Sequence, residues 1–135
     1  MRALGLAIMI SLLASASVAQ PATAPGGPWM VFFDWGKPEV RSDDQPVLDE
    51  VAATYRAKPA AHLQLAGHTD RSGSAAVNRV AGLRRAETIR TELEKRGVPR
   101  KAIGIVSFGE DQPLVPTEDG VREVQNRRVE IRIEE

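Results

Sequence analysis

The chain has 135 residues, enough for one ordinary domain, and it contains no cysteine, so disulfide bonds do not stabilise it. Its 18 Lys and Arg residues balance 18 Asp and Glu residues. This balance excludes the strongly basic surface of a general nucleic-acid-binding protein, and we expect no nucleic-acid partner.

The first residues have the layout of a secretory signal peptide. Arg2 supplies a positive charge, residues 3–13 are almost entirely apolar, and Ser17-Val18-Ala19 is a small-x-small cleavage site. The apolar run is shorter than the about 20 residues that span a bilayer. We therefore expect residues 1–19 to be a leader and the mature protein to be periplasmic. We expect it to lack a direct membrane anchor, so that any association with the outer membrane would go through a partner.

Residues 20–28 (QPATAPGGP) resemble a flexible linker, and the expected domain covers residues 29–135. Residues 29–33 predict a first strand that ends at Asp34. Apolar residues at helical spacing then predict a helix that Ser42 or Asp43 caps and Pro59 ends. The apolar positions of this helix are Val47, Leu48, Val51, Ala52 and Tyr55.

Residues 62–66 alternate as a second strand, and a second helix is expected from about Ala75 to Arg96. Gly97 can adopt the left-handed conformation after the helix, and Pro99 prevents its continuation. The buried stripe expected on this helix consists of Val77, Val80, Leu83, Ala86, Ile89 and Leu93.

A third strand is expected at residues 102–108 and a fourth at residues 129–133, separated by a loop over residues 109–124. The order βαβαββ predicts an α/β two-layer sandwich, with two helices on one face of a mixed four-stranded sheet. Right-handed crossovers would bring the ends of the first two strands, and therefore Asp34 and Asp70, near each other.

The segment GHTDRSG, residues 67–73, raises the question of a site. A metal site is disfavoured because the only other histidine, His62, lies at the far end of the same strand. A hydrolytic site built on His68, Asp70 and Ser72 or Ser74 is also disfavoured, because no nucleophile elbow is present. We expect His68 to be a structural residue that tightens the loop by hydrogen bonding, and we expect no enzyme activity, cofactor or metal.

A charged binding pocket fits the pattern better. Asn78 and Arg85 are seven residues apart and share one helix face, with the small residues Ala81 and Gly82 between them. Asp70 can lie over the first turns of this helix. The three side chains would suit a ligand that carries both an ammonium and a carboxylate, although Asp70 and Arg85 could instead pair with each other.

Several blocks of sequence together resemble the OmpA-like peptidoglycan-binding domain, which is found in OmpA-type porins, peptidoglycan-associated lipoproteins and flagellar stator proteins. The resemblance covers about residues 31–133. The blocks are Phe33-Asp34, GHTDRSG at 67–73, Asn78, LRRA at 83–86, VSFGEDQP at 106–113 and NRRVEI at 126–131.

The resemblance implies binding of peptidoglycan through the meso-diaminopimelate residue of the stem peptide. The family's two anchors match Asp70, for the ammonium, and Arg85, for the carboxylate. Asn78 would hold the loop or a stem carbonyl and the adjacent Thr69 would contact ligand. Asp34 and Arg128 are expected to line or brace the same pocket.

The sequence departs from the family pattern at Val77, at Ala81-Gly82 and at Trp35-Gly36, where the family usually has other residues. These departures support one alternative from another class: an envelope protein-interaction module that keeps the fold but has a weakened wall-binding pocket.

Overall fold

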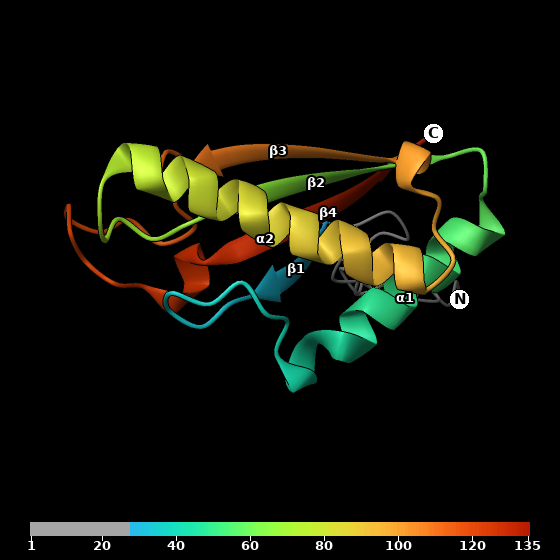
Figure 1. Ribbon diagram of the computed structural model, residues 1–135, viewed down its shortest axis with the longest axis horizontal. Coiled ribbons are helices and arrows are strands. Elements are labelled where there is room, and N and C mark those ends of the chain that lie inside the picture. Colours follow the sequence, from blue (N-terminus) through green and yellow to red (C-terminus); the bar gives the residue numbers. More distant parts are fainter. Residues whose placement is uncertain (1–27) are drawn as a thin grey trace, which may run out of the picture.

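The computed structural model describes residues 28–135. The expected leader, residues 1–19, and residues 20–27 of the expected linker lie outside the described residues. The expected βαβαββ order is confirmed (Figure 1). The elements are β1 (Trp29–Phe32), α1 (Gln45–Ala57), β2 (His62–His68), α2 (Ala75–Lys95), β3 (Ile103–Gly109) and β4 (Arg128–Glu134).

The sheet is mixed, with strand order β1-β4-β2-β3. β4 runs antiparallel to β1 and to β2, whereas β2 and β3 are parallel. The carboxyl ends of β1, β2 and β3 therefore lie at one edge of the sheet, and β4 begins there, between β1 and β2. Figure 1 shows that α2 also starts at this end of the molecule.

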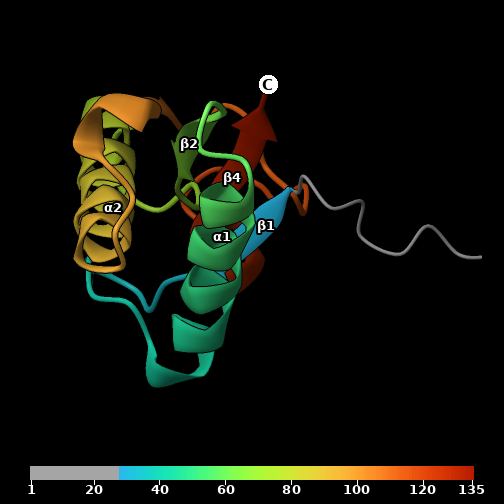
Figure 2. The same ribbon diagram turned by 90° about the vertical axis from the view of Figure 1, so that its right-hand side faces the viewer.

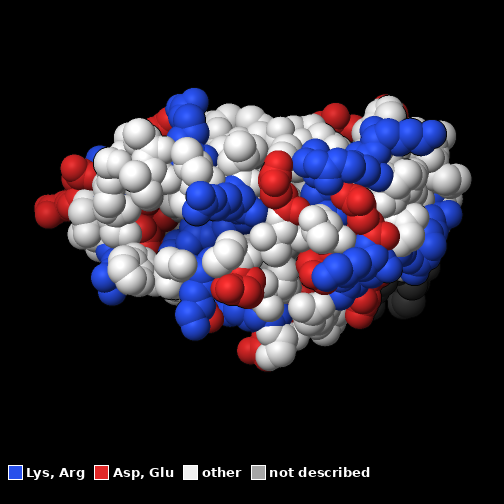
Figure 3. Space-filling model, in the orientation of Figure 1, with Lys and Arg blue, Asp and Glu red and all other residues white. Residues whose placement is uncertain are grey.

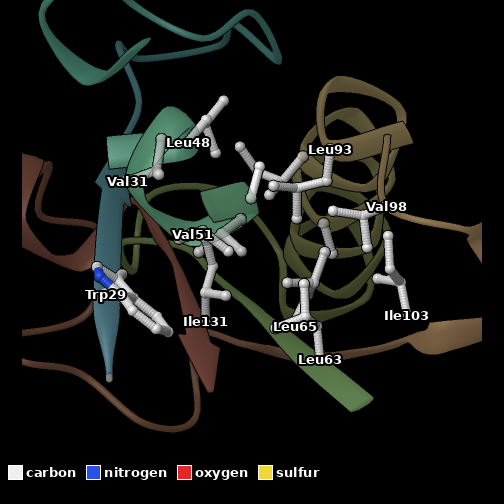
Figure 4. Packing of buried hydrophobic residues seen from close by; sticks show 14 of the residues in the cluster. Trp29, Val31, Leu48, Val51, Leu63, Leu65, Leu93, Val98, Ile103 and Ile131 are labelled. Atoms are coloured by element: carbon white, nitrogen blue, oxygen red, sulfur yellow. The ribbon is translucent and has the colours of Figure 1, made fainter. Parts of the chain in front are cut away.

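Both helices cover one face of the sheet, as predicted. Figure 2 shows α1 and α2 side by side. Alternate strand positions supply the apolar face beneath them: Val31 pairs with Val129, and Leu65 lies between Ile131 and Ile105 in the neighbouring strands. These side chains meet Leu48, Val51 and Tyr55 of α1 and Ala86, Ile89 and Leu93 of α2 in a single core (Figure 4).

The start of α1 differs from the expectation. Neither Ser42 nor Asp43 caps this helix, because residues 42–44 form a 3-10 turn and α1 begins only at Gln45. The last residue of the turn, Asp44, pairs with Arg41 at 3.1 Å. The end of α2 is as expected, because Gly97 follows it with φ +90°.

The buried stripe of α2 was predicted correctly only in its second half, where Ala86, Ile89 and Leu93 are fully buried. In the first half, the exposed fractions of Val77, Val80 and Leu83 are 64%, 50% and 41%. The buried residues there are Asn78, Gly82 and Arg85. A straight helix keeps one face toward the sheet. When the buried face of α2 is followed from Ile89 toward the N-terminus at helical spacing, it passes through Arg85, Gly82 and Asn78, which are not apolar side chains. Apolarity was therefore the wrong guide at this end of α2.

Candidate functional site

A cavity of about 410 Å³ lies beside the first turns of α2. Its walls come from α2 and from the loops that follow β1, follow β2 and precede β4. It contains four of the six residues predicted to contact ligand, namely Thr69, Asp70, Asn78 and Arg85. The other lining residues are Trp35, Gly36, Ser72, Gly73, Val77, Ala81, Gly120, Arg122 and Arg127.

Asp70 is buried and its carboxylate accepts hydrogen bonds on both oxygens. Oδ1 accepts from the backbone N–H and the hydroxyl of Ser72, and Oδ2 accepts from the backbone N–H of Glu123 at 3.2 Å. Oδ2 also pairs with Arg127 Nη1 at 2.8 Å. Burial alone would raise the pKa of Asp70, but the hydrogen bonds from Ser72 and Arg127 outweigh it and hold the pKa below its usual value. Asp70 is thus ionised, and its ion-pair partner is Arg127 rather than Arg85.

Arg85 is only 5% exposed. Its Nη1 donates to the carbonyl oxygen of His68 at 3.3 Å, and its guanidinium lies 5.4 Å from the centre of the Phe33 ring. Within residues 28–135, no carboxylate oxygen lies within ion-pairing distance of this guanidinium. Burial, followed by repulsion from Arg127, lowers the pKa of Arg85 to about 10, although Asp70 opposes the shift. An anion in the cavity would meet a buried cation with unused N–H donors.

Asn78 and Thr69 hold the loop that carries Asp70. The Asn78 side-chain amide donates to the backbone oxygen of Asp70 at 3.3 Å and to Glu110 at 3.2 Å. The Thr69 backbone N–H donates to the carbonyl of Gly109 at 2.8 Å, and its hydroxyl donates to the carbonyl of Asp70. These bonds join the loop after β2 to α2 and to the end of β3. The polar floor of the cavity is therefore held in place before any ligand arrives.

Gly82 lies against the sheet, where its close neighbours are Ser107 of β3 and Gly67 of β2. A Cβ on Gly82 would lie 2.3 Å from Ser107 Oγ, and a Cβ on Gly67 of β2 would lie 1.9 Å from the Gly82 carbonyl oxygen. The two glycines let α2 lie directly on β2, and this contact sets the depth of Asn78 and Arg85 in the cavity.

Asp34 does not line the cavity, although β1 and β2 end at the same edge as predicted. It is exposed, and the next residue, Trp35, forms the wall instead. Trp35 Nε1 donates to Ser72 Oγ at 3.2 Å, and the guanidinium of Arg122 lies 3.5 Å from the centre of its ring. The unusual residue after the Phe-Asp pair was a usable signal, because an exposed tryptophan at a strand end is often a contact residue.

Arg128 also lies outside the cavity, and Arg127 takes the place expected of it. The buried Arg128 donates to Glu130 at 3.1 Å and to the backbone oxygen of Gln112 at 3.1 Å, so it braces the loop after β3. Strand alternation could have separated the two arginines. Val129 points toward the helices, and Arg127, two residues earlier, belongs to the same face.

His68 is buried as a structural residue, but the expected hydrogen bonds are wrong. Neither ring nitrogen has a hydrogen-bond partner within the described residues. The ring stacks on Phe108 with centroids 5.5 Å apart, and Nε2 lies 3.7 Å from Glu130. Burial and the nearby Arg128 lower the pKa of His68 to about 4, against the opposing effect of Glu130. The part of the chain that the structure describes contains no group of three side chains that could hold a metal ion.

Residues 32–127 match the family model described as the OmpA family. The chain is 36% identical over 116 residues to an outer membrane protein of Gluconacetobacter diazotrophicus, covering 82% of this chain and 31% of that protein. It is 35% identical over 101 residues to the peptidoglycan-associated lipoprotein of Legionella pneumophila, covering 75% of this chain and 57% of the relative. It thus spans less than two thirds of either relative.

Among solved structures, the fold is similar to the peptidoglycan-associated lipoprotein from Burkholderia pseudomallei. The TM-score is 0.73 and the sequence identity is 30%, over 78% of this chain and 89% of the other. The shared element order, the sequence relatives and the family match over most of the chain agree, and the protein therefore belongs to the OmpA family.

Proposed function

We propose that the protein binds peptidoglycan in the periplasm, without catalysing a reaction, through the meso-diaminopimelate residue of the stem peptide. The observation that carries this proposal is Arg85, a buried arginine without a carboxylate partner in residues 28–135, in the same cavity as the buried and ionised Asp70. Two relatives whose names contain "peptidoglycan-associated" support the same class of ligand.

The free end of diaminopimelate carries an ammonium and a carboxylate on one carbon, and the cavity offers a group for each. The planar guanidinium of Arg85 can bind the carboxylate through two parallel hydrogen bonds. The ammonium can replace the Ser72 hydroxyl as a donor to Asp70, which exchanges a neutral donor for a cationic one on the ionised carboxylate. Arg127 stays paired with the other oxygen of Asp70 and keeps the carboxylate in place.

This chemistry discriminates between wall types. A stem peptide with lysine in place of diaminopimelate supplies the ammonium but lacks the carboxylate, so Arg85 would remain unpaired. A charge-assisted hydrogen bond contributes about 1.5–3 kcal/mol, which corresponds to about tenfold to a hundredfold weaker binding of the lysine form. Because association itself is costly, we expect modest affinity for one stem and stronger retention on a wall that presents many stems.

The proposed periplasmic location depends on the leader expected at residues 1–19, and an envelope protein is the partner proposed for any contact with the outer membrane. Within residues 28–135, the structure has no helix with the length and apolar character that a bilayer crossing needs.

The test is co-sedimentation with purified diaminopimelate-type sacculi, together with calorimetry on a soluble diaminopimelate stem tripeptide. We expect Arg85→Ala to lose binding in both assays. Arg79→Ala is the matched control, because Arg79 lies on the same helix but is exposed and does not line the cavity. Circular dichroism must show that both variants remain folded.

If Arg85→Ala sediments with sacculi as well as wild type does, the diaminopimelate proposal is wrong. That result would favour the protein-interaction module, for which the exposed Val77, Val80 and Leu83 on α2 are the best structural argument.

A further inference from the structure

A second hollow, of about 520 Å³, adjoins the cavity along α2. Four residues line both spaces: Gly36, Val77, Ala81 and Arg85. The residues that line only the second hollow are Lys37, Pro38, Ala76, Val80 and Arg84. A ligand held by Arg85 can therefore continue into this hollow without leaving the protein surface.

The hollow has an apolar floor that the core does not require. Val77 and Val80 are 64% and 50% exposed, and Ala76, Ala81 and Pro38 add further aliphatic surface. Exposed apolar side chains that gather beside a polar cavity indicate a contact surface more often than isolated ones do. The hollow suits small apolar groups rather than a sugar or a strongly polar chain.

The charges around the two spaces are unequal. In the part of the chain that the structure describes, five basic residues line them, whereas Asp70 is the only acidic residue in either lining. Among residues 28–135, Arg127 is the one of these five with an ion-pair partner. The basic residues are Lys37, Arg84, Arg85, Arg122 and Arg127. Figure 3 shows basic side chains gathered beside the N-terminal half of α2. A single zwitterion leaves most of this positive charge without a counterpart, so a ligand with additional carboxylates fits better.

We propose that the second hollow binds the carboxy-terminal D-alanyl residue of an uncross-linked stem peptide. Its methyl group would lie on Val77 and Val80, and its carboxylate would lie between Lys37 and Arg84. This inference rests on the proposed function, because it places diaminopimelate in the adjoining cavity. In a stem longer than a tripeptide, D-alanine directly follows diaminopimelate. The short methylene side chain of diaminopimelate separates the peptide backbone from the zwitterionic end. The next residue thus has to lie beside the cavity.

The proposal predicts a preference among wall fragments. Cross-linking through D-alanine converts the terminal carboxylate into an amide, whereas removal of D-alanine deletes the methyl group and moves the terminal carboxylate back onto diaminopimelate, away from Lys37 and Arg84. The protein should therefore prefer stems that end in a free D-alanine. Because Lys37 and Arg84 are exposed, the effect should be modest and should weaken with salt.

The experiment compares three soluble ligands by calorimetry at low salt: the diaminopimelate stem tripeptide, the tetrapeptide that ends in D-alanine, and the same tetrapeptide with a C-terminal amide. We expect the tetrapeptide to bind about fivefold to tenfold more tightly than the tripeptide, and the amide to lose most of this gain. In the Lys37→Ala/Arg84→Ala variant, the gain should disappear while tripeptide affinity stays close to that of wild type.

Lys101→Ala/Arg56→Ala is the matched control, because it removes two exposed cations from residues that line neither space. Equal affinities for tripeptide and tetrapeptide in wild type would overturn the inference and leave the proposed function intact. A gain that survives in Lys37→Ala/Arg84→Ala would overturn it as well. If neither peptide binds, the proposed function fails and this inference fails with it.

Discussion

Replacing Arg127 by glutamine tests how far the cavity depends on its internal ion pair. Arg127 and Asp70 are paired at 2.8 Å, and their side chains are only 10% and 3% exposed. Arg127 Nε also donates to the carbonyl of Phe33 at 3.0 Å, so it holds the end of β1 against the start of β4. Its removal would leave a buried carboxylate without its cation.

Breaking a buried ion pair on one side destabilises proteins by about 3–5 kcal/mol. Asp70 keeps the Ser72 and Glu123 hydrogen bonds, which places the expected loss of unfolding free energy near the lower end, about 3 kcal/mol. In a domain of this size, such a loss lowers the melting temperature by about 10 °C or more.

The assay is urea unfolding of wild type, Asp70→Asn, Arg127→Gln and the double variant. The double variant should lose less than the sum of the single losses, with a coupling of about 1–3 kcal/mol. Arg79→Gln is the control, because its pair with Asp111 is 3.5 Å long and exposed on both sides, and we expect a loss below about 1 kcal/mol. A loss below about 1 kcal/mol for Arg127→Gln, or a coupling near zero, would refute the reasoning.

The same pair has a pH signature. The folded state depresses the pKa of Asp70, so the unfolded chain binds a proton at a higher pH than the folded chain does. The stabilisation is thus fully present above the unfolded pKa of about 3.8 and is lost as the pH falls through the lower folded value. Asp70→Asn should lose this component of the acid dependence.

Three further predictions concern α2 and the residues beneath it. Gly67→Ala should destabilise the protein by several kcal/mol or prevent folding, because its Cβ would lie 1.9 Å from the backbone oxygen of Gly82. A melting temperature close to that of wild type would contradict the close packing of α2 on β2. Val80→Ser should change the unfolding free energy by less than about 0.5 kcal/mol because Val80 is 50% exposed, whereas Ile89→Ala should cost about 2–5 kcal/mol because Ile89 lies in the core. Equal losses for the two variants in urea unfolding would show that the assigned helix face is incorrect. The NMR resonances of His68 should titrate near pH 4, below its ordinary pKa of 6.5. Because the unfolded chain takes up this proton at the higher pH, the free energy of unfolding should fall as the pH drops from 6.5 to 4. Resonances that shift near pH 6.5 would contradict this prediction.

The local sequence was sufficient to predict most of the secondary structure and the layer arrangement. The spacing of apolar residues predicted the helix α2. The local signals Gly97 and Pro99 predicted its C-terminal end to within one residue. Resemblance to the OmpA-like domain then indicated the cavity residues Asp70 and Arg85.

The contacts within the cavity could not be predicted in the same way. Hydropathy assigned Val80 to the core and could not recognise that Arg85 lies on the buried face, because α2 covers a polar cavity at one end and an apolar core at the other. By contrast, Arg127 and Arg128 could have been separated, because the alternation of β4 extended back from Val129 places them on opposite faces of the sheet.

The sequence by itself determined the order of strands and helices, the end of α2 and the apolar half of its buried face, since these depend on neighbours within a few turns of the chain. Only the tertiary structure decided that Asp70 pairs with Arg127, so that Arg85 has no ion-pair partner among residues 28–135. The physical reason is strand order: the last strand enters the sheet between β1 and β2, and it places an arginine that is 57 residues away in sequence against the loop carboxylate.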